Sequence, residues 1–305
     1  MALPIPRNVG AQTIAVPAGR GPGHWVGAPS VLVRGGVHHV AYRSRRPVDD
    51  GRGGDVIVAR VGARGELTEL CRIDKVSMDA ESLERPALVV DGAGRWRLYL
   101  SCATAGTRHW RVEVLQADSP AGFVPAGRRV VMPGDAHVAM KDPVIICDER
   151  GWRAWICSHP LDDPNATDRM WTEFATSDDG FDWKLHGPAL QPIPGRWDQR
   201  GTRVTAIIER GDMILALYDG RADATENFEE RTGIAAGRAE QLEVVGDAPV
   251  AQSPGPYPAL RYAAVVDDGD RIAVYYEAGC EDGSHELRRE WSARLNAGIA
   301  RLPYA

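Results

Sequence analysis

Long hydrophobic runs are missing from this chain of 305 residues, although 44% of its residues are hydrophobic. No uninterrupted apolar stretch approaches the ~20 residues that a helix needs to span a bilayer. The N-terminal segment Met1–Pro6 also lacks the positive region and apolar core of a signal peptide. We therefore expect no membrane partner, no secretory leader and a cytoplasmic location.

Concentrated positive charge is scarce as well. The formal net charge is −6, and no run of Lys and Arg is longer than two residues. Because nucleic-acid binding needs a basic patch or stripe, we expect no nucleic-acid partner. Arg43, Arg45, Arg46 and Arg52 cluster in the sequence, and two interpretations stay open for them: a solvated loop at the rim of the fold, or a group that binds an anion or substrate.

Cysteine is too rare, and too irregular, for a disulfide framework. The five cysteines are odd in number, and most fall inside expected strands, as Cys102 and Cys157 do. They are typical of small buried hydrophobes in a reducing compartment. His38 and His39 are adjacent in an expected strand, so their side chains point to opposite faces and cannot ligate one metal ion together. We expect no metal and no cofactor.

A long-period repeat is the main pattern that is present. Pro29, Pro86 and Pro143 recur at one constant spacing, and each opens an apolar run. A Gly- or Asp-rich turn follows each run, and such turns supply the positive φ angles that tight hairpins need. A second and a third strand-like run follow in every copy. A fixed period of this size indicates a repeat architecture.

The copies number five, which predicts an all-β fold, a five-bladed β-propeller. Second strands are expected at 38–42, 96–100, 152–156, 213–218 and 271–276. The propeller would be one domain over residues 1–305, with blade openings near 27, 84, 141, 201 and 257. The alternative is a pair of stacked β-sandwiches, but sandwiches have no reason to keep such a period.

The antiparallel blade also predicts where functional side chains meet. The start of the first strand and the end of the second lie at the same rim, and the first strands crowd the central axis. Residues at these positions should therefore converge on one funnel. The starts of the first strands contribute Ala28, Arg85, Asp142, Arg203 and Tyr257. The ends of the second strands contribute Arg43, Arg45, Cys102, His159, Asp219, Arg221 and Glu277. Neighbouring loops add His24, Trp25 and Glu84.

Asp142 is the central candidate among them. Arg85 holds the equivalent position in the adjacent blade, and a pair between the two would lower the pKa of Asp142. Such an ionised carboxylate would orient a substrate and would not donate a proton. Trp25 could stack on a sugar ring or pack between two blades. Residues 225–231 are expected to form a helical turn or lid with solvated charges.

The chain resembles the five-bladed propeller glycosidases. The resemblance rests on the five copies, on the Lys141-Asp142-Pro143 type of opening and on the Ser177–Trp183 turn, S-x-D-G-x-x-W. This superfamily includes the arabinanases and β-xylosidases of glycoside hydrolase family 43, the invertases of family 32 and the mannoside phosphorylases of family 130. The family-43 pattern implies a pKa-tuning Asp in blade three, which Asp142 matches. Its blade-one Asp is replaced by Ala28.

Glycoside hydrolysis usually requires two carboxyl groups that flank the scissile bond. Only Asp142 stands at a position implied by the resemblance, so Glu84, Asp219 and Glu277 are the candidate proton-transfer partners. The candidate substrate-binding residues are Trp25, Arg45, Arg85, His159, Arg203, Arg221, Tyr257 and Arg261. We expect a glycosidase, or a phosphorylase whose arginines bind phosphate, acting on a small glycoside, anionic or neutral. A catalytically silent carbohydrate- or small-ligand-binding propeller and a protein-interaction scaffold are the alternatives.

Overall fold

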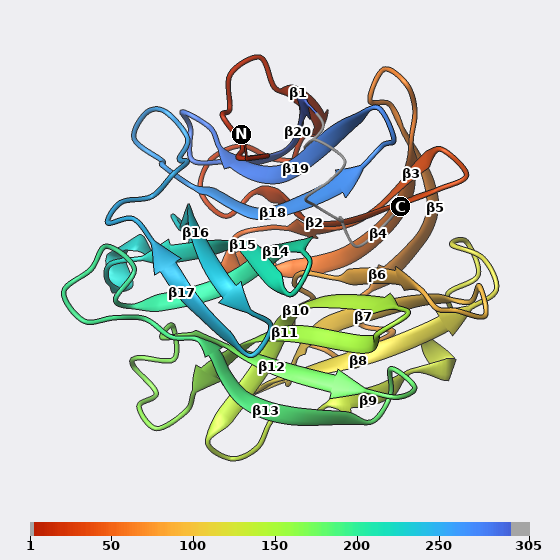
Figure 1. Cartoon of the computed structure of the whole chain (residues 1–305), viewed down its shortest axis with the longest axis horizontal. Coiled ribbons are helices and arrows are strands. Elements are labelled where there is room, and N and C mark those ends of the chain that lie inside the picture. The colour runs from red at the N-terminus through yellow and green to blue at the C-terminus, as the bar shows by residue number, and fades with distance from the viewer. Residues whose placement is uncertain (1–2, 294–305) are drawn as a thin grey trace.

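Five antiparallel four-stranded blades surround a central axis in the computed structural model, which describes residues 3–293 (Figure 1). The first blade contains β2 (Trp25–Arg34), β3 (Val37–Arg45), β4 (Gly53–Val61) and β5 (Leu67–Asp74). The second contains β6 (Ala87–Val90), β7 (Trp96–Ala103), β8 (Trp110–Ala117) and β9 (Arg129–Met132). The third contains β10 (Val138–Asp148), β11 (Gly151–Pro160), β12 (Trp171–Ser177) and β13 (Trp183–Leu190). The predicted propeller is confirmed.

The last two blades differ in how they are completed. The fourth contains β14 (Gly201–Arg210), β15 (Met213–Arg221), β16 (Arg231–Arg238) and β17 (Gln241–Val245). The fifth contains β18 (Leu260–Asp267), β19 (Arg271–Gly279), β20 (His285–Ala293) and, as its outer strand, β1 (Gln12–Ala15). Because β1 pairs antiparallel with β20, a strand from the beginning of the chain closes the ring. A parallel contact between Trp25 and His285 further joins the first and fifth blades.

The hairpin turns follow the residues that the sequence places there. Between β2 and β3, Gly35 and Gly36 have φ angles of 59° and 72°, the two positive values that a type I′ turn requires. In the turn before β13, Ser177 Oγ accepts a hydrogen bond from the Gly180 backbone. Trp183 at its end packs edge-on against Trp152, with ring centroids 6.4 Å apart. This turn therefore has a structural role, because it packs Trp183 against a buried cluster.

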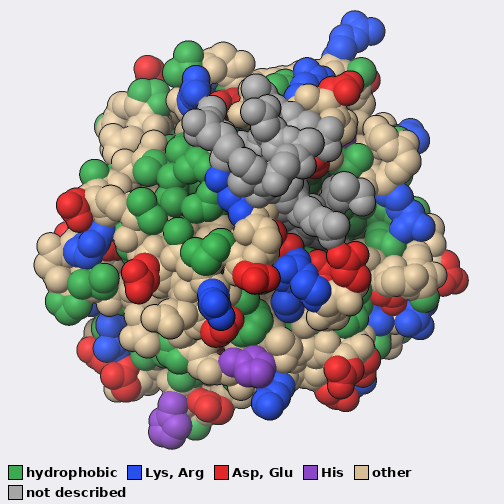
Figure 2. All heavy atoms as spheres, viewed as in Figure 1, with side chains coloured by type: hydrophobic (Ala, Val, Ile, Leu, Met, Phe, Trp, Pro, Cys, Tyr) green, Lys and Arg blue, Asp and Glu red, His purple; other side chains and the backbone are tan. Residues whose placement is uncertain are grey.

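Hydrophobic cores fill the spaces between successive blades. Leu32 of the first blade and Leu88 of the second belong to one buried cluster, for example, and comparable clusters join each following pair of blades around the ring. The five cysteines are free thiols. On the face drawn in Figure 2, acidic and basic side chains are interspersed. Among residues 3–293, no helix is long and apolar enough to cross a membrane.

Candidate functional site

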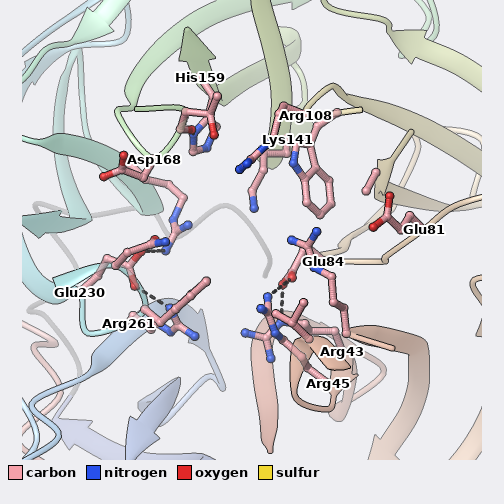
Figure 3. A pocket seen from close by; sticks show the side chains of 18 of the residues that line it. Arg43, Arg45, Glu81, Glu84, Arg108, Lys141, His159, Asp168, Glu230 and Arg261 are labelled. Carbon is pink, nitrogen blue, oxygen red and sulfur yellow. Dashed lines mark hydrogen bonds and ion pairs between the residues drawn. The ribbon is translucent and has the colours of Figure 1, made fainter. Parts of the chain in front are cut away.

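A cavity of about 470 Å³ opens at the end of the axis where the first strands begin (Figure 3). All five blades contribute to its wall, through residues such as Arg45, Glu84, Lys141, Arg221 and Arg261. These side chains come from the starts of first strands and the ends of second strands. The rim at which the sequence predicted convergence is therefore the rim that carries the cavity.

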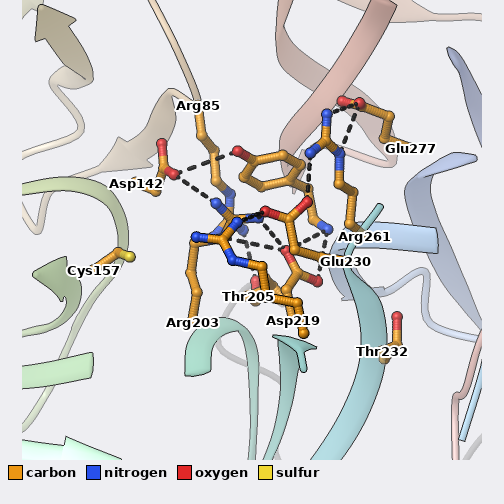
Figure 4. Close-up of polar contacts among 12 residues, drawn as sticks. Arg85, Asp142, Cys157, Arg203, Thr205, Asp219, Glu230, Thr232, Arg261 and Glu277 are labelled. Carbon is orange, nitrogen blue, oxygen red and sulfur yellow. Dashed lines mark hydrogen bonds and ion pairs between the residues drawn. The ribbon is translucent and has the colours of Figure 1, made fainter. Parts of the chain in front are cut away.

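The four carboxylates considered for catalysis lie at two depths. Glu84 lines the cavity. Asp142, Asp219 and Glu277 are fully buried and are not among the lining residues. Figure 4 shows these three carboxylates in a network of arginines. Direct contact with a ligand in the cavity is thus open to Glu84 and closed to the other three in this conformation.

The residues considered for substrate binding also divide into two groups. Those that line the cavity are Arg45, His159, Arg203, Arg221 and Arg261. Those that do not line it are Trp25, Arg85 and Tyr257. The Trp25 ring is buried and stacks on His285 at a centroid distance of 4.7 Å, with the Arg45 guanidinium 4.6 Å from its centroid. Its surroundings correspond to packing between blades and not to stacking on a ligand.

The position assigned to Tyr257 is occupied by Tyr262 instead. Strand β18 begins at Leu260, three residues beyond Tyr257, and Tyr262 lines the cavity. Asp142 and Tyr262 have φ angles of 53° and 54° and lie at matching irregularities of strand register, so they are the equivalent residues. The proline repeat did not reveal that Tyr262 is the equivalent residue, because Ala263, and not a proline, follows it.

Asp142 pairs with a different arginine from the one expected. Arg203 Nη1 lies 3.0 Å from Asp142 Oδ2, and its Nη2 lies 2.7 Å from Asp219 Oδ2. Arg85 instead donates a hydrogen bond from Nη2 to the Thr205 carbonyl at 2.6 Å. The expected pair between Arg85 and Asp142 is wrong, because Arg203 reaches between the two carboxylates and holds both.

Glu230 is a central residue of the site that sequence reasoning missed. It lines the cavity, is 2% exposed, and accepts hydrogen bonds from Arg221 at 2.6 Å and from Arg261 at 2.5 Å. The expectation of solvated charges over 225–231 is therefore wrong at Glu230, although a helical turn, η3 (Ala224–Glu226), does precede it. Its place directly before β16, beside the end of β15, was the available signal.

Two of the lining carboxylates are locked in the ionised state. Glu84 accepts hydrogen bonds from Arg43 and Arg45, each at 2.6 Å. Burial alone would raise the pKa of Glu84, but these two guanidinium groups hold it well below its usual range. Burial likewise opposes ionisation of Glu230, and Arg261 with Arg221 holds its pKa well below the usual range. Neither group can serve as a proton donor near neutral pH.

Asp219 has the opposite electrostatic character. Burial raises its pKa to about 6, against the lowering effect of Arg203, and repulsion from Glu230 adds to the rise. The Tyr262 backbone N–H donates to its carboxylate at 3.1 Å. Asp219 can therefore take up a proton just below neutral pH, behind the wall of the cavity.

His159 lines the cavity as a neutral ring with both nitrogens engaged. Nδ1 lies 3.0 Å from the Thr167 carbonyl oxygen and must donate a hydrogen bond to it. Nε2 lies 3.3 Å from the Cys157 sulfur and accepts a hydrogen bond from that thiol. Burial, together with the nearby Lys141 cation, lowers the pKa of His159 well below its usual value. The ring contributes shape and not charge to the site.

Three lining cations have no hydrogen-bonded partner within residues 3–293: Arg52, Arg108 and Lys141. The Lys141 ammonium lies 3.5 Å from Asp142 and 4.3 Å from the centre of the Trp110 ring, and Arg52 lies 5.8 Å from the same ring. Arg52, Arg108 and Lys141 are called the ligand-facing cation group below. They lie on the side of the cavity built by the first three blades. In the described part of the chain, no group of three or more His, Cys, Asp or Glu is placed to hold a metal ion.

Solved structures with the same fold act on glycosides. A thermostable family-43 glycoside hydrolase superposes with a TM-score of 0.69 at 14% identity, over 96% of each chain. A family-43 β-xylosidase/α-arabinofuranosidase from a compost microbial metagenome, in complex with xylotriose, also gives 0.69 at 14% identity, over 99% of this chain and 100% of that one. The β-1,2-mannobiose phosphorylase of Listeria innocua gives 0.63 at 13% identity, over 94% and 92%.

These similarities define the class of fold. The chain is a five-bladed propeller of the kind shared by glycoside hydrolases of family 43 and mannoside phosphorylases. No family model matches the sequence, and no curated protein matches it. The resemblance drawn from the sequence is thereby confirmed at the level of the fold.

Proposed function

We propose that this propeller binds a small anionic saccharide in its central cavity and does not cut glycosidic bonds with a carboxylate pair. The observation that carries this proposal is the charge of the wall. Cationic side chains outnumber acidic ones among the lining residues, although the whole chain is net negative. The cations are Arg43, Arg45, Arg52, Arg108, Lys141, Arg203, Arg221 and Arg261. The acids are Glu81, Glu84, Asp168 and Glu230.

A saccharide is the ligand class that the fold favours. The xylosidase and the mannobiose phosphorylase with this architecture are complexes with xylotriose and β-1,2-mannobiose. The volume of about 470 Å³ suits a ligand of one or two sugar rings. Trp110 offers an aromatic face beside the cations of Lys141 and Arg52, so a carboxylated or phosphorylated sugar could be held by ring contact and by charge together.

Hydrolysis by two carboxyl groups is poorly supported by the same wall. One of the two groups must give up a proton, yet Glu84 and Glu230 are each held ionised by two arginines. Asp168 is paired with Arg200 at 2.7 Å, and this arginine helps to lower its pKa against the effect of burial. Glu81 is the one lining carboxylate without an ion pair in the described chain, which leaves a single candidate acid.

Removing a ligand-facing cation should weaken binding selectively. We expect glucuronate or glucose 6-phosphate to bind more tightly than glucose in calorimetric titrations. Lys141→Met should reduce the affinity for the anionic sugars by roughly 10- to 100-fold, the effect of losing one charged hydrogen bond. Lys184→Met, which removes an exposed lysine from β13, is the matched control and should change nothing. Equal affinity for glucose and glucuronate would contradict an anion-selective site.

A screen of nitrophenyl glycosides, with and without inorganic phosphate, tests the absence of cleavage. We expect no turnover above the uncatalysed rate, and the same for the Glu81→Gln variant. Turnover without phosphate that Glu81→Gln abolishes would replace this proposal with a hydrolase. Turnover that requires phosphate would replace it with a phosphorylase, in which the ligand-facing cation group binds the attacking phosphate.

A further inference from the structure

Buried charge around the axis does not balance. Six arginines, each 5% exposed or less, surround it: Arg43, Arg45, Arg85, Arg203, Arg221 and Arg261. The carboxylates buried among them, none more than 2% exposed, are Glu84, Asp142, Asp219, Glu230 and Glu277. Six cations thus face five anions. A buried charge without a counter-charge costs free energy of folding, because it loses its solvation by water and gains no compensating ion pair.

In the described chain, Arg85 is the one arginine of this group without an ion pair. Burial lowers its pKa, and the carboxylates of Asp142 and Asp219 offset this only in part. Each of the other five forms an ion pair with at least one of the buried acids. Arg85 forms none within residues 3–293, and its one hydrogen bond is the one from Nη2 to the Thr205 carbonyl. Its Nε and Nη1 atoms are buried and have no hydrogen-bond partner. Two donor nitrogens of a positive group, which together carry three N–H bonds, therefore remain unsatisfied.

Arg85 also lines a small second cavity. It measures about 30 Å³ and is lined by the first strands of all five blades, from Ser30 to Val265, with Arg85 as its one charged lining residue. We call it the axial chamber. A water molecule needs roughly 10–15 Å³ measured in this way, so the chamber has room for a monatomic ion and none for a sugar. Arg85 does not line the larger cavity. Figure 4 draws Arg85 together with Thr205, whose carbonyl accepts its hydrogen bond.

We propose that the axial chamber binds a halide ion, chloride under ordinary conditions, as the counter-ion of Arg85. The ion would accept hydrogen bonds from Nε and Nη1 and would bring the buried charge to balance. The other lining side chains are small or apolar, so they leave the guanidinium as the recognition element. The site is separate from the cavity of the proposed function and does not rest on that proposal.

Halide-dependent stability tests this inference. The protein is prepared in sodium methanesulfonate and is titrated with sodium bromide at constant ionic strength, while the melting temperature Tm is followed. Each tenfold increase of bromide above its dissociation constant should raise Tm by roughly 2–4 °C. Arg85→Met should abolish the bromide dependence. Arg64→Met, which removes an exposed arginine from the turn between β4 and β5, should retain it.

A bromide-soaked crystal gives a second measurement that does not need the variant to fold. We expect an anomalous peak inside the axial chamber, within hydrogen-bonding distance of Arg85 Nε or Nη1. An unchanged Tm across the titration, a dependence that survives in Arg85→Met, or bromide found in the 470 Å³ cavity and not in the chamber would each overturn the proposal.

Discussion

Glu230→Gln should lower the free energy of unfolding by about 3–5 kcal/mol, the usual cost of breaking a buried ion pair by removing one partner. Glu230 is shared by Arg221 and Arg261, and Arg203 Nη2 lies 3.9 Å from it. Glutamine keeps the shape and one acceptor oxygen but leaves three buried guanidinium groups near an uncharged amide. Urea unfolding followed by tryptophan fluorescence measures the loss.

Glu240→Gln supplies the control for this measurement. Glu240 is exposed in the turn between β16 and β17, and the same substitution there should change the unfolding free energy by less than about 0.5 kcal/mol. A loss below about 1 kcal/mol in Glu230→Gln would show that the arginines find other partners. Asn227, which already accepts from Arg221 at 2.8 Å, is the nearest alternative.

The unfolding free energy of the wild-type protein minus that of the Asp219→Asn variant should fall as the pH rises from 4 to 7. The pKa of Asp219 is about 6 in the folded protein, against about 3.9 for an unfolded aspartate. The folded state therefore holds this proton more tightly than the unfolded state does. The resulting stabilisation is fully present below pH ~4 and is lost as the pH rises through 6. The change should be on the order of 2–3 kcal/mol.

The comparison with the asparagine variant isolates one group. All other titratable groups are the same in both proteins, so their contributions cancel in the difference between the two unfolding free energies. Chemical unfolding at each half pH unit gives the curve. If the difference stays constant from pH 4 to 7, Asp219 is ionised throughout, and Arg203 outweighs burial in setting its pKa.

Sequence periodicity predicted the five blades because each hairpin repeats the same local chemistry. Proline opens three of the first strands, and positive-φ glycines such as Gly35 and Gly36 close the turns. The fourth strand of the fifth blade could not be found in this way. Its four residues, Gln12–Ala15, pair with β20 at the other end of the sequence, and no local pattern encodes so distant a partner.

Hairpin geometry predicted that the candidate side chains converge on one end of the axis, but not their depth or their pairing. Glu84, Asp142 and Asp219 lie near that end, and hairpin geometry cannot tell a side chain that lines the cavity from one buried behind it. Arginine side chains are long, so Arg203 could reach two acids from a neighbouring strand. Glu230 was missed because a charged loop normally faces solvent.

Closure of the ring by β1 has a consequence for how the protein forms during synthesis. Strands β2 to β17 can assemble as four consecutive blades while the chain is still growing, since each uses only neighbouring segments. The fifth blade must wait until β20 has emerged to meet β1, and these two segments are separated by almost the whole sequence. Until β20 has been synthesised, the fifth blade is incomplete, and its lining residues, such as Arg261, cannot complete the wall of the cavity.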